Sequence, residues 1–248
     1  HKNGYNICNS SMWGEMLDPM AEDSKHVLIR GEKASKSGEH LPKVFKVNIV
    51  TGVNKQIARS PVMDGQFLTD QAHQVRFVTG VDEKNKRRSY YYQDDKWVGT
   101  AELNIANNSF YPISINGDKN QVYATYAENG EPDGLYLFDL ASGKKTLIYQ
   151  HKNVSLTAVK TDKSGYVYAV EYDDGYPATS IIDPTHPEAK IFKKLMQVLP
   201  GYSLSVISET LNSDSKVVYA YNQFNAGYYF LYEVKKDTLS QLFNTRVW

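Results

Sequence analysis

Short alternating runs of apolar and polar residues, each introduced by a polar turn, recur along the chain. Each run is rich in β-branched and aromatic residues, the composition of a pleated strand. The turns and the runs that follow them occupy residues 23–32, 70–83, 117–130, 162–175 and 214–223. The aspartates of successive turns lie 44 to 52 residues apart. A near-constant interval of about 45 residues is typical of the blades of a β-propeller.

Three of these repeats continue into a recognisable second half, at 44–58, 135–149 and 229–243. Each second half reads as an alternating strand, a tight turn and another short strand. Gly52 and Gly143 lie in two of the turns, where they supply the positive φ that a short hairpin requires. We therefore predict an all-β fold, a β-propeller of four-stranded antiparallel blades with about five blades visible. Another β-sandwich or a β-solenoid is the alternative.

One segment breaks the alternation and predicts a helix. We expect a short amphipathic helix near 187–199, because Pro187 suits a first helical turn and Pro200-Gly201 ends it. The helix is inserted where the fourth blade would otherwise form its outer strands. The apolar residues at helical spacing are Ala189, Phe192, Leu195, Met196 and Leu199. We expect this stripe to pack on the blade edge; a partner-facing surface is the alternative.

Length and charge restrict the function classes. The 248 residues suit one large all-β unit, so we interpret 1–248 as a single propeller domain. Lys and Arg together number 28, as do Asp and Glu, so no net field attracts nucleic acid or an anionic membrane. The longest apolar runs, 217–221 and 228–232, are far shorter than the roughly 20 residues of a membrane span. We predict neither a nucleic-acid partner nor a membrane span.

The sequence offers no catalytic constellation. Cys8 is the single cysteine, which excludes an internal disulfide or a cysteine-based zinc site, and the six histidines are scattered. The segment 201–205 resembles a hydrolase nucleophile elbow around Ser203, but Ser205 replaces the second glycine, and the predicted helix precedes it. We predict no catalytic residue, no metal site and no cofactor.

Hairpin tips are the remaining candidates for binding. The pair Asp94-Asp95 and the basic-aromatic run 82–92 are interpreted as solvated hairpins. The loop within 171–179 combines carboxylates, tyrosines and a constrained Tyr-Pro bond, and loops on rigid scaffolds often carry function. We expect an ordinary blade connection here, and a loop that contacts a peptide or small molecule is the alternative. The candidate peptide-contact residues are Tyr172, Asp173, Asp174 and Tyr176.

The last third of the chain carries an ordered set of motifs. These are the Asp183-Pro184 step, a short helix closed by Leu199-Pro200-Gly201, the Asp214 turn, and a strand with Tyr228-Tyr229 and Leu231. In this order, residues 180–248 resemble the end of the propeller domain in serine peptidases of the prolyl oligopeptidase family. The acylaminoacyl-peptidase and dipeptidyl-aminopeptidase-like branch is the most similar. Val247 departs from the pattern, because the family usually has proline there.

The resemblance implies a larger parent protein. In that family a propeller, usually seven-bladed, caps a C-terminal α/β-hydrolase domain that holds the Ser-Asp-His triad. The chain would then be a fragment lacking that hydrolase and one or two early blades. Residues 1–22, with Trp13 and Met16, read as the tail of an earlier blade. We expect the unpaired edges of such a fragment to promote self-association. Arg246 and Trp248 are expected at the domain junction.

The implied role is that of a non-catalytic cap that gates the active site of a peptidase acting on short peptides. Its partners would be the hydrolase domain of the same polypeptide and peptide substrates. This chain alone is not expected to be an enzyme, whereas its parent would be a serine peptidase, and related bacterial enzymes are often exported. Two alternatives stay open: a stand-alone propeller that binds a protein or peptide, and an independent propeller enzyme such as a glycosidase or lactonase.

Overall fold

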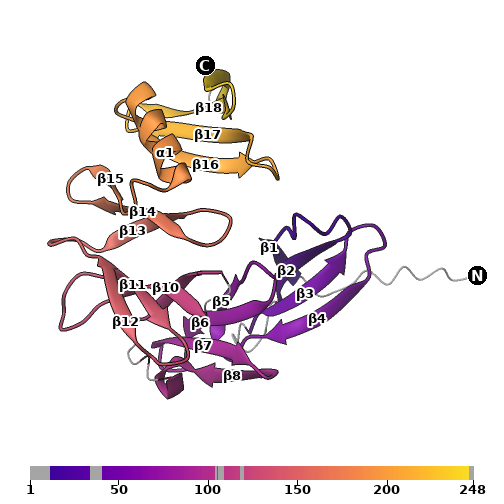
Figure 1. Ribbon diagram of the computed structural model, residues 1–248. Coiled ribbons are helices and arrows are strands. Elements are labelled where there is room, and N and C mark those ends of the chain that lie inside the picture. The colour runs from indigo at the N-terminus through magenta and orange to yellow at the C-terminus, as the bar shows by residue number, and fades with distance from the viewer. Residues whose placement is uncertain (1–11, 34–40, 104, 106–108, 118–119, 246–248) are drawn as a thin grey trace, which may run out of the picture. The chain divides into compact units, whose positions relative to one another are not determined.

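The structure is a computed structural model that describes residues 12–33, 41–103, 105, 109–117 and 120–245 (Figure 1). Two compact units make up the chain, and each is described by itself. The first comprises His1–Leu156 and Thr161–Val167, and the second comprises Thr157–Lys160 and Tyr168–Trp248. The described residues form antiparallel sheets that each follow the chain order, the meander of a propeller blade.

Three four-stranded sheets belong to the first unit. The first sheet contains β1 (Met12–Asp18), β2 (His26–Lys33), β3 (Lys43–Asn48) and β4 (Asn54–Arg59). The second contains β5 (Met63–Thr69), β6 (Val75–Val81), β7 (Arg87–Gln93) and β8 (Lys96–Gly99), followed by the 3-10 helix η1 (Thr100–Leu103). The third contains β9 (Tyr111–Ile115), β10 (Gln121–Tyr126), β11 (Gly134–Asp139) and β12 (Lys145–Tyr149).

The second unit holds most of the fourth sheet, the helix and the fifth sheet. The fourth sheet has three strands, β13 (Leu156–Thr161), β14 (Val167–Asp173) and β15 (Pro177–Ile181). The helix α1 (Pro187–Val198) follows, and then the fifth sheet with β16 (Ser203–Glu209), β17 (Ser215–Asn222), β18 (Asn225–Glu233) and β19 (Thr238–Asn244). The prediction of an all-β propeller of four-stranded antiparallel blades with one short helix is confirmed: the described residues form five blades, of which the fourth has three strands followed by the helix.

The recurring aspartate turn joins the first and second strands of a blade. In the second sheet, Asp70 Oδ1 accepts hydrogen bonds from the backbone N–H groups of Ala72 (3.0 Å) and Gln74 (2.9 Å). Asp162 does the same in the fourth sheet, with the N–H groups of Ser164 (2.8 Å) and Tyr166 (3.0 Å). A carboxylate that binds backbone donors two and four residues ahead fixes a tight turn, which explains why the motif repeats.

This turn position corrects the expected start of the first blade. Residues 12–18 were read as part of the tail of an earlier blade, and that reading is wrong. Strand β1 pairs antiparallel with β2, from Met12 opposite Lys33 to Asp18 opposite Leu28. Each sheet therefore begins one strand before its aspartate turn, because the turn is a hairpin connection and not the boundary between blades.

The core of the first unit lies between neighbouring sheets. Successive residues of β6 point to opposite faces, so Phe77 and Val78 enter different apolar clusters. Phe77 is fully buried with Phe110 and Phe138 in the cluster shared with the third sheet. Val78 is fully buried with Leu28 of the first sheet. A middle strand that is apolar on both faces is what stacked blades require.

The helix α1 takes the place of an outer strand after the fourth sheet. His186 caps its start, with Nδ1 accepting a hydrogen bond from Glu188 N at 3.2 Å. Ala189, Phe192 and Leu195 are buried, so the predicted helix is confirmed and its apolar stripe packs inward. Within the part of the chain that the structure describes, no helix has both the length and the apolar character to cross a membrane.

A buried lysine fastens α1 to the fifth sheet. Lys216 on β17 is only 1% exposed, and its Nζ donates to Glu188 Oε1 of α1 (3.0 Å) and to Glu209 Oε2 of β16 (2.5 Å). Burial opposes the charged form of Lys216, but the bonds to Glu209 and Glu188 outweigh it and raise its pKa. The charged network therefore joins three elements of the second unit.

A second polar contact joins the helix to the same sheet. Asp237 pairs with Lys194 of α1 and accepts a hydrogen bond from the hydroxyl of Tyr232 at 2.8 Å. Burial, followed by the bond to Asp237, raises the pKa of Tyr232 to about 12. The bond to Lys194, followed by that to Tyr232, lowers the pKa of Asp237.

Candidate functional site

The predicted peptide-contact residues lie together at the tip of the β14–β15 hairpin. Tyr172 and Asp173 end β14, and they pair with residues at the start of β15. Asp174 and Tyr176 lie in the turn, where Gly175 adopts φ +87°, the left-handed conformation that glycine tolerates. Tyr176 is 80% exposed. The segment is at the same time a connection between two paired strands of one blade.

Two of the four candidates line a pocket of the second unit. The pocket has a volume of about 490 Å³ and is formed by the fourth sheet, α1 and the first two strands of the fifth sheet. Its residues include Tyr172, Asp173, Phe192, Met196, Tyr202 and Tyr221. Its size falls in the range of small-molecule and peptide side-chain sites, roughly 300–1,000 Å³.

The tyrosine rings of this pocket are held by their neighbours. Tyr202 packs edge-on against Tyr228, with ring centroids 6.0 Å apart, and its hydroxyl accepts a hydrogen bond from Asn225 Nδ2 at 3.3 Å. Tyr221 stacks on Tyr219 at a centroid distance of 5.3 Å. Rings fixed in this way lose little conformational freedom when a ligand binds.

Lys160, which does not itself line the pocket, contacts three of the lining residues. Lys160 Nζ lies 2.7 Å from Glu171 Oε1 and donates to the carbonyl oxygen of Leu204 at 2.9 Å. The same ammonium lies 4.7 Å from the centroid of the Phe192 ring, within cation–π distance. Since Lys160 neutralises Glu171, the charge that remains on the pocket lining is that of Asp173.

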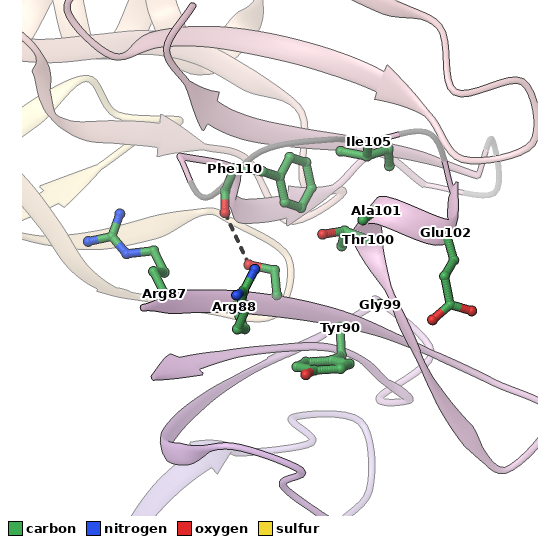
Figure 2. Close-up of a pocket in the computed structure, with 10 residues that line it drawn as sticks. Arg87, Arg88, Tyr90, Gly99, Thr100, Ala101, Glu102, Ile105 and Phe110 are labelled. Carbon is green, nitrogen blue, oxygen red and sulfur yellow. Dashed lines mark hydrogen bonds between the residues drawn. The ribbon is translucent and has the colours of Figure 1, made fainter. Parts of the chain in front are cut away.

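Another pocket, of about 310 Å³, lies in the first unit beside β7 and η1 (Figure 2). The hydroxyl of Ser89 on β7 donates a hydrogen bond to the carbonyl oxygen of Phe110 at 3.0 Å. In Figure 2 this bond is the dashed line that ends at Phe110. Ile105 and Phe110 are each 1% exposed, and Arg88 pairs with Asp82 at 2.9 Å. These contacts are those of a packing junction between the second and third sheets, so the pocket of the second unit is the stronger candidate.

The local structure around Ser203 differs from that of a nucleophile elbow. Ser203 is the first residue of β16 and follows α1, whereas a nucleophile elbow requires a strand and then a helix. Residues 12–33, 41–103, 105, 109–117 and 120–245 contain no cluster of three metal-ligating His, Cys, Asp or Glu side chains. Cys8 and the predicted junction residues Arg246 and Trp248 lie outside the described residues.

Several pocket residues were not predicted as binding residues. Phe192 and Met196 were interpreted only as part of the apolar stripe of the helix, and Tyr202 and Tyr221 lie more than 25 positions beyond the hairpin tip. Met196 carried no such signal in the sequence; in the structure it is 37% exposed, whereas Ala189, Phe192 and Leu195 of the same stripe are buried. The tyrosines carried none either, since the chain contains 19 tyrosines and nothing local distinguishes these two.

Comparison with curated proteins shows similarity to dipeptidyl aminopeptidase BIII of Pseudoxanthomonas mexicana. The two sequences are 28% identical over 211 residues, which cover 82% of this chain and 30% of that protein. The chain thus spans less than a third of the length of the curated relative. No protein-family model matches the chain.

Solved structures show a more distant likeness. TolB from Acinetobacter baumannii is 7% identical, with a TM-score of 0.47, and the match covers 96% of this chain and 70% of that one. A putative TolB from Agrobacterium tumefaciens is 8% identical, with a TM-score of 0.35, and the match covers 90% and 65% of the two chains. These values carry no inference about function.

Proposed function

We propose that this chain is the non-catalytic β-propeller part of a serine peptidase of the prolyl oligopeptidase family, and that it caps and gates the active site. The match to dipeptidyl aminopeptidase BIII carries the proposal, because it covers 82% of this chain but only 30% of that relative. Most of the relative's length is therefore available for a catalytic domain, which would be the partner of this propeller in the same polypeptide.

Gating by a propeller has a simple physical basis. A narrow opening excludes a folded protein, while an extended peptide can pass and reach the hydrolase behind it. In this proposal the pocket around Tyr172 and Asp173 contacts the peptide, and Arg246 and Trp248 contribute to the junction with the hydrolase. Rigid sheets suit this role, because they hold loop residues at fixed positions without moving themselves.

The reading frame that encodes the chain provides the test. Its continuation beyond the codon for Trp248 is expected to encode an α/β-hydrolase with a Gly-x-Ser-x-Gly elbow and downstream Asp and His. A stop codon, or an unrelated domain, would contradict the proposal and favour a stand-alone propeller that binds a peptide or protein partner. Turnover of a sugar or lactone by the purified chain would contradict both readings.

A further inference from the structure

The pocket of the second unit combines a negative charge with aromatic walls. Among its described lining residues, the ionisable side chains that are negative at neutral pH are Glu171 and Asp173, and Lys160 already neutralises Glu171. Asp173 lies at the exposed hairpin tip. Because the lining residues include no lysine or arginine within the described part of the chain, the pocket favours a cationic ligand.

The rings determine what kind of cation fits. Tyr172, Tyr202 and Tyr221 line the pocket together with the side chains of Phe192 and Met196. Tyrosine faces attract cations, and a planar guanidinium can also stack on them while it donates two parallel hydrogen bonds to a carboxylate. A compact ammonium can contact a carboxylate and a ring together, as Lys160 does with Glu171 and Phe192. It has no planar face to stack and no fixed fork of two parallel donors, so this lining favours arginine over lysine.

A cation already lies in similar surroundings, on the far side of the lining residues Glu171, Phe192 and Leu204. The ammonium of Lys160 is held by the carboxylate of Glu171, the carbonyl of Leu204 and the ring of Phe192. Its side chain is only 11% exposed, so these partners replace most of its hydration. The lining around Asp173 offers the same kinds of group, a carboxylate and aromatic rings, on the solvent-accessible side.

We propose that this pocket binds the arginine side chain of an extended peptide, with Asp173 as the ion partner and the rings of Tyr202 and Tyr221 as stacking surfaces. The inference deepens the proposed function and rests on it for the choice of a peptide as the ligand. The binding itself requires no hydrolase, since every group that it uses belongs to this chain.

Calorimetric titration of the purified chain tests the proposal. The probes are acetyl-Ala-Ala-Arg-Ala-Ala-amide and the matched peptides with Lys or Gln at the centre. The arginine peptide is expected to bind about 10-fold more tightly than the glutamine peptide, with the lysine peptide between them. Its affinity is expected to fall several-fold between about 0.05 and 0.5 M salt, because the Asp173 contact is exposed to screening.

Two substitutions on the same hairpin separate a specific contact from a general charge effect. Asp173→Asn is expected to weaken binding of the arginine peptide about 5- to 10-fold. Asp174→Asn removes the same charge one residue away, outside the pocket lining, and is expected to change the affinity less than about 2-fold. Both side chains are exposed at the hairpin tip, so both variants are expected to fold, as unchanged thermal melting would show.

Three results would overturn the inference: equal affinities for the arginine and glutamine peptides, equal effects of the two substitutions, or tight binding of a glutamine peptide that has a free amino terminus. The last result would assign the site to a terminal ammonium. These outcomes differ from a failure of the proposed function, because a reading frame without a hydrolase leaves the peptide titration unaffected. Conversely, a hydrolase downstream with no arginine preference refutes only the arginine site.

Discussion

Replacing Lys216 with methionine removes the cation that joins α1 to the fifth sheet. The side chain of Lys216 is 2% exposed and holds Glu188 and Glu209, whose side chains are 20% and 22% exposed. Methionine fills a similar volume, so the Lys216→Met variant keeps the packing but leaves two carboxylates facing each other. The substitution therefore measures the electrostatic part of this attachment.

The expected loss of stability follows from this geometry. Removing one partner from a buried ion network costs about 3–5 kcal/mol. Since both glutamates keep some contact with water, we expect a loss in the free energy of unfolding of about 3 kcal/mol, the lower end of this range. In a protein of this size about 1 kcal/mol shifts Tm by about 2–4 °C, so the expected decrease is about 6–12 °C.

Thermal unfolding followed by circular dichroism measures the decrease, with two control variants. Lys235→Met removes an exposed lysine that pairs with Asp214 at 2.7 Å, and it is expected to cost less than about 1 kcal/mol. Adding Glu188→Gln and Glu209→Gln to Lys216→Met removes the two carboxylates that have lost their partner. The triple variant is expected to recover most of the Tm lost in Lys216→Met. A change below about 1 °C in Lys216→Met would refute the reasoning.

The same network predicts a pH dependence. The folded state raises the pKa of Lys216 above its ordinary value of 10.5, so the charged form is favoured more in the folded than in the unfolded chain. This stabilisation is fully present below pH 10.5 and is lost as the pH rises through the folded-state pKa. The difference in Tm between the wild type and Lys216→Met is therefore expected to narrow in alkaline solution, and a constant difference would contradict the assignment.

Other predictions concern packing and ionisation in the fifth sheet. A Cβ added at Gly227, where φ is +136°, would lie 2.2 Å from the ring of Tyr219, so Gly227→Ala is expected to cost about 2–4 kcal/mol in urea unfolding. Gly52→Ala is the control, because its φ is +73° but its Cβ would meet open space, and about 1–2 kcal/mol is expected. A loss in Gly227→Ala no larger than in this control would refute the packing argument. Since the pKa of Tyr232 is about 12, Tyr232→Phe is expected to remove one tyrosine from the absorbance change near pH 12; an unchanged amplitude there would contradict it.

The sequence predicted the blades well because their signals are local. Alternating side chains define a strand, and a glycine at a hairpin needs positive φ, as Gly52 (φ +73°) and Gly143 (φ +69°) show. Which strand begins each blade was harder to predict, since the aspartate turn has the same sequence pattern whether it precedes the first strand or joins the first two strands. Only the pairing of β1 with β2 decides between these.

The candidate site was predictable only in part, for a physical reason. The hairpin tip with Tyr172 and Asp173 could be recognised from its own residues. The opposite wall, with Met196 and Tyr221, comes from α1 and the fifth sheet, and no local pattern says which side chains those elements bring to the hairpin. The buried role of Lys216 was likewise hidden, because an alternating strand with a lysine reads as solvent-facing until its two glutamate partners are known.

Fluorophosphonate labelling, followed by mass spectrometric mapping of the adduct, tests the central claim that this chain gates a catalytic serine held elsewhere. In the protein encoded by the complete reading frame, the adduct is expected on a serine outside residues 1–248, with loss of dipeptidyl-p-nitroanilide hydrolysis. The purified chain of 248 residues is expected to remain unlabelled and inactive. An adduct on Ser203 or another serine within the chain, or amide hydrolysis by the chain alone, would contradict the account.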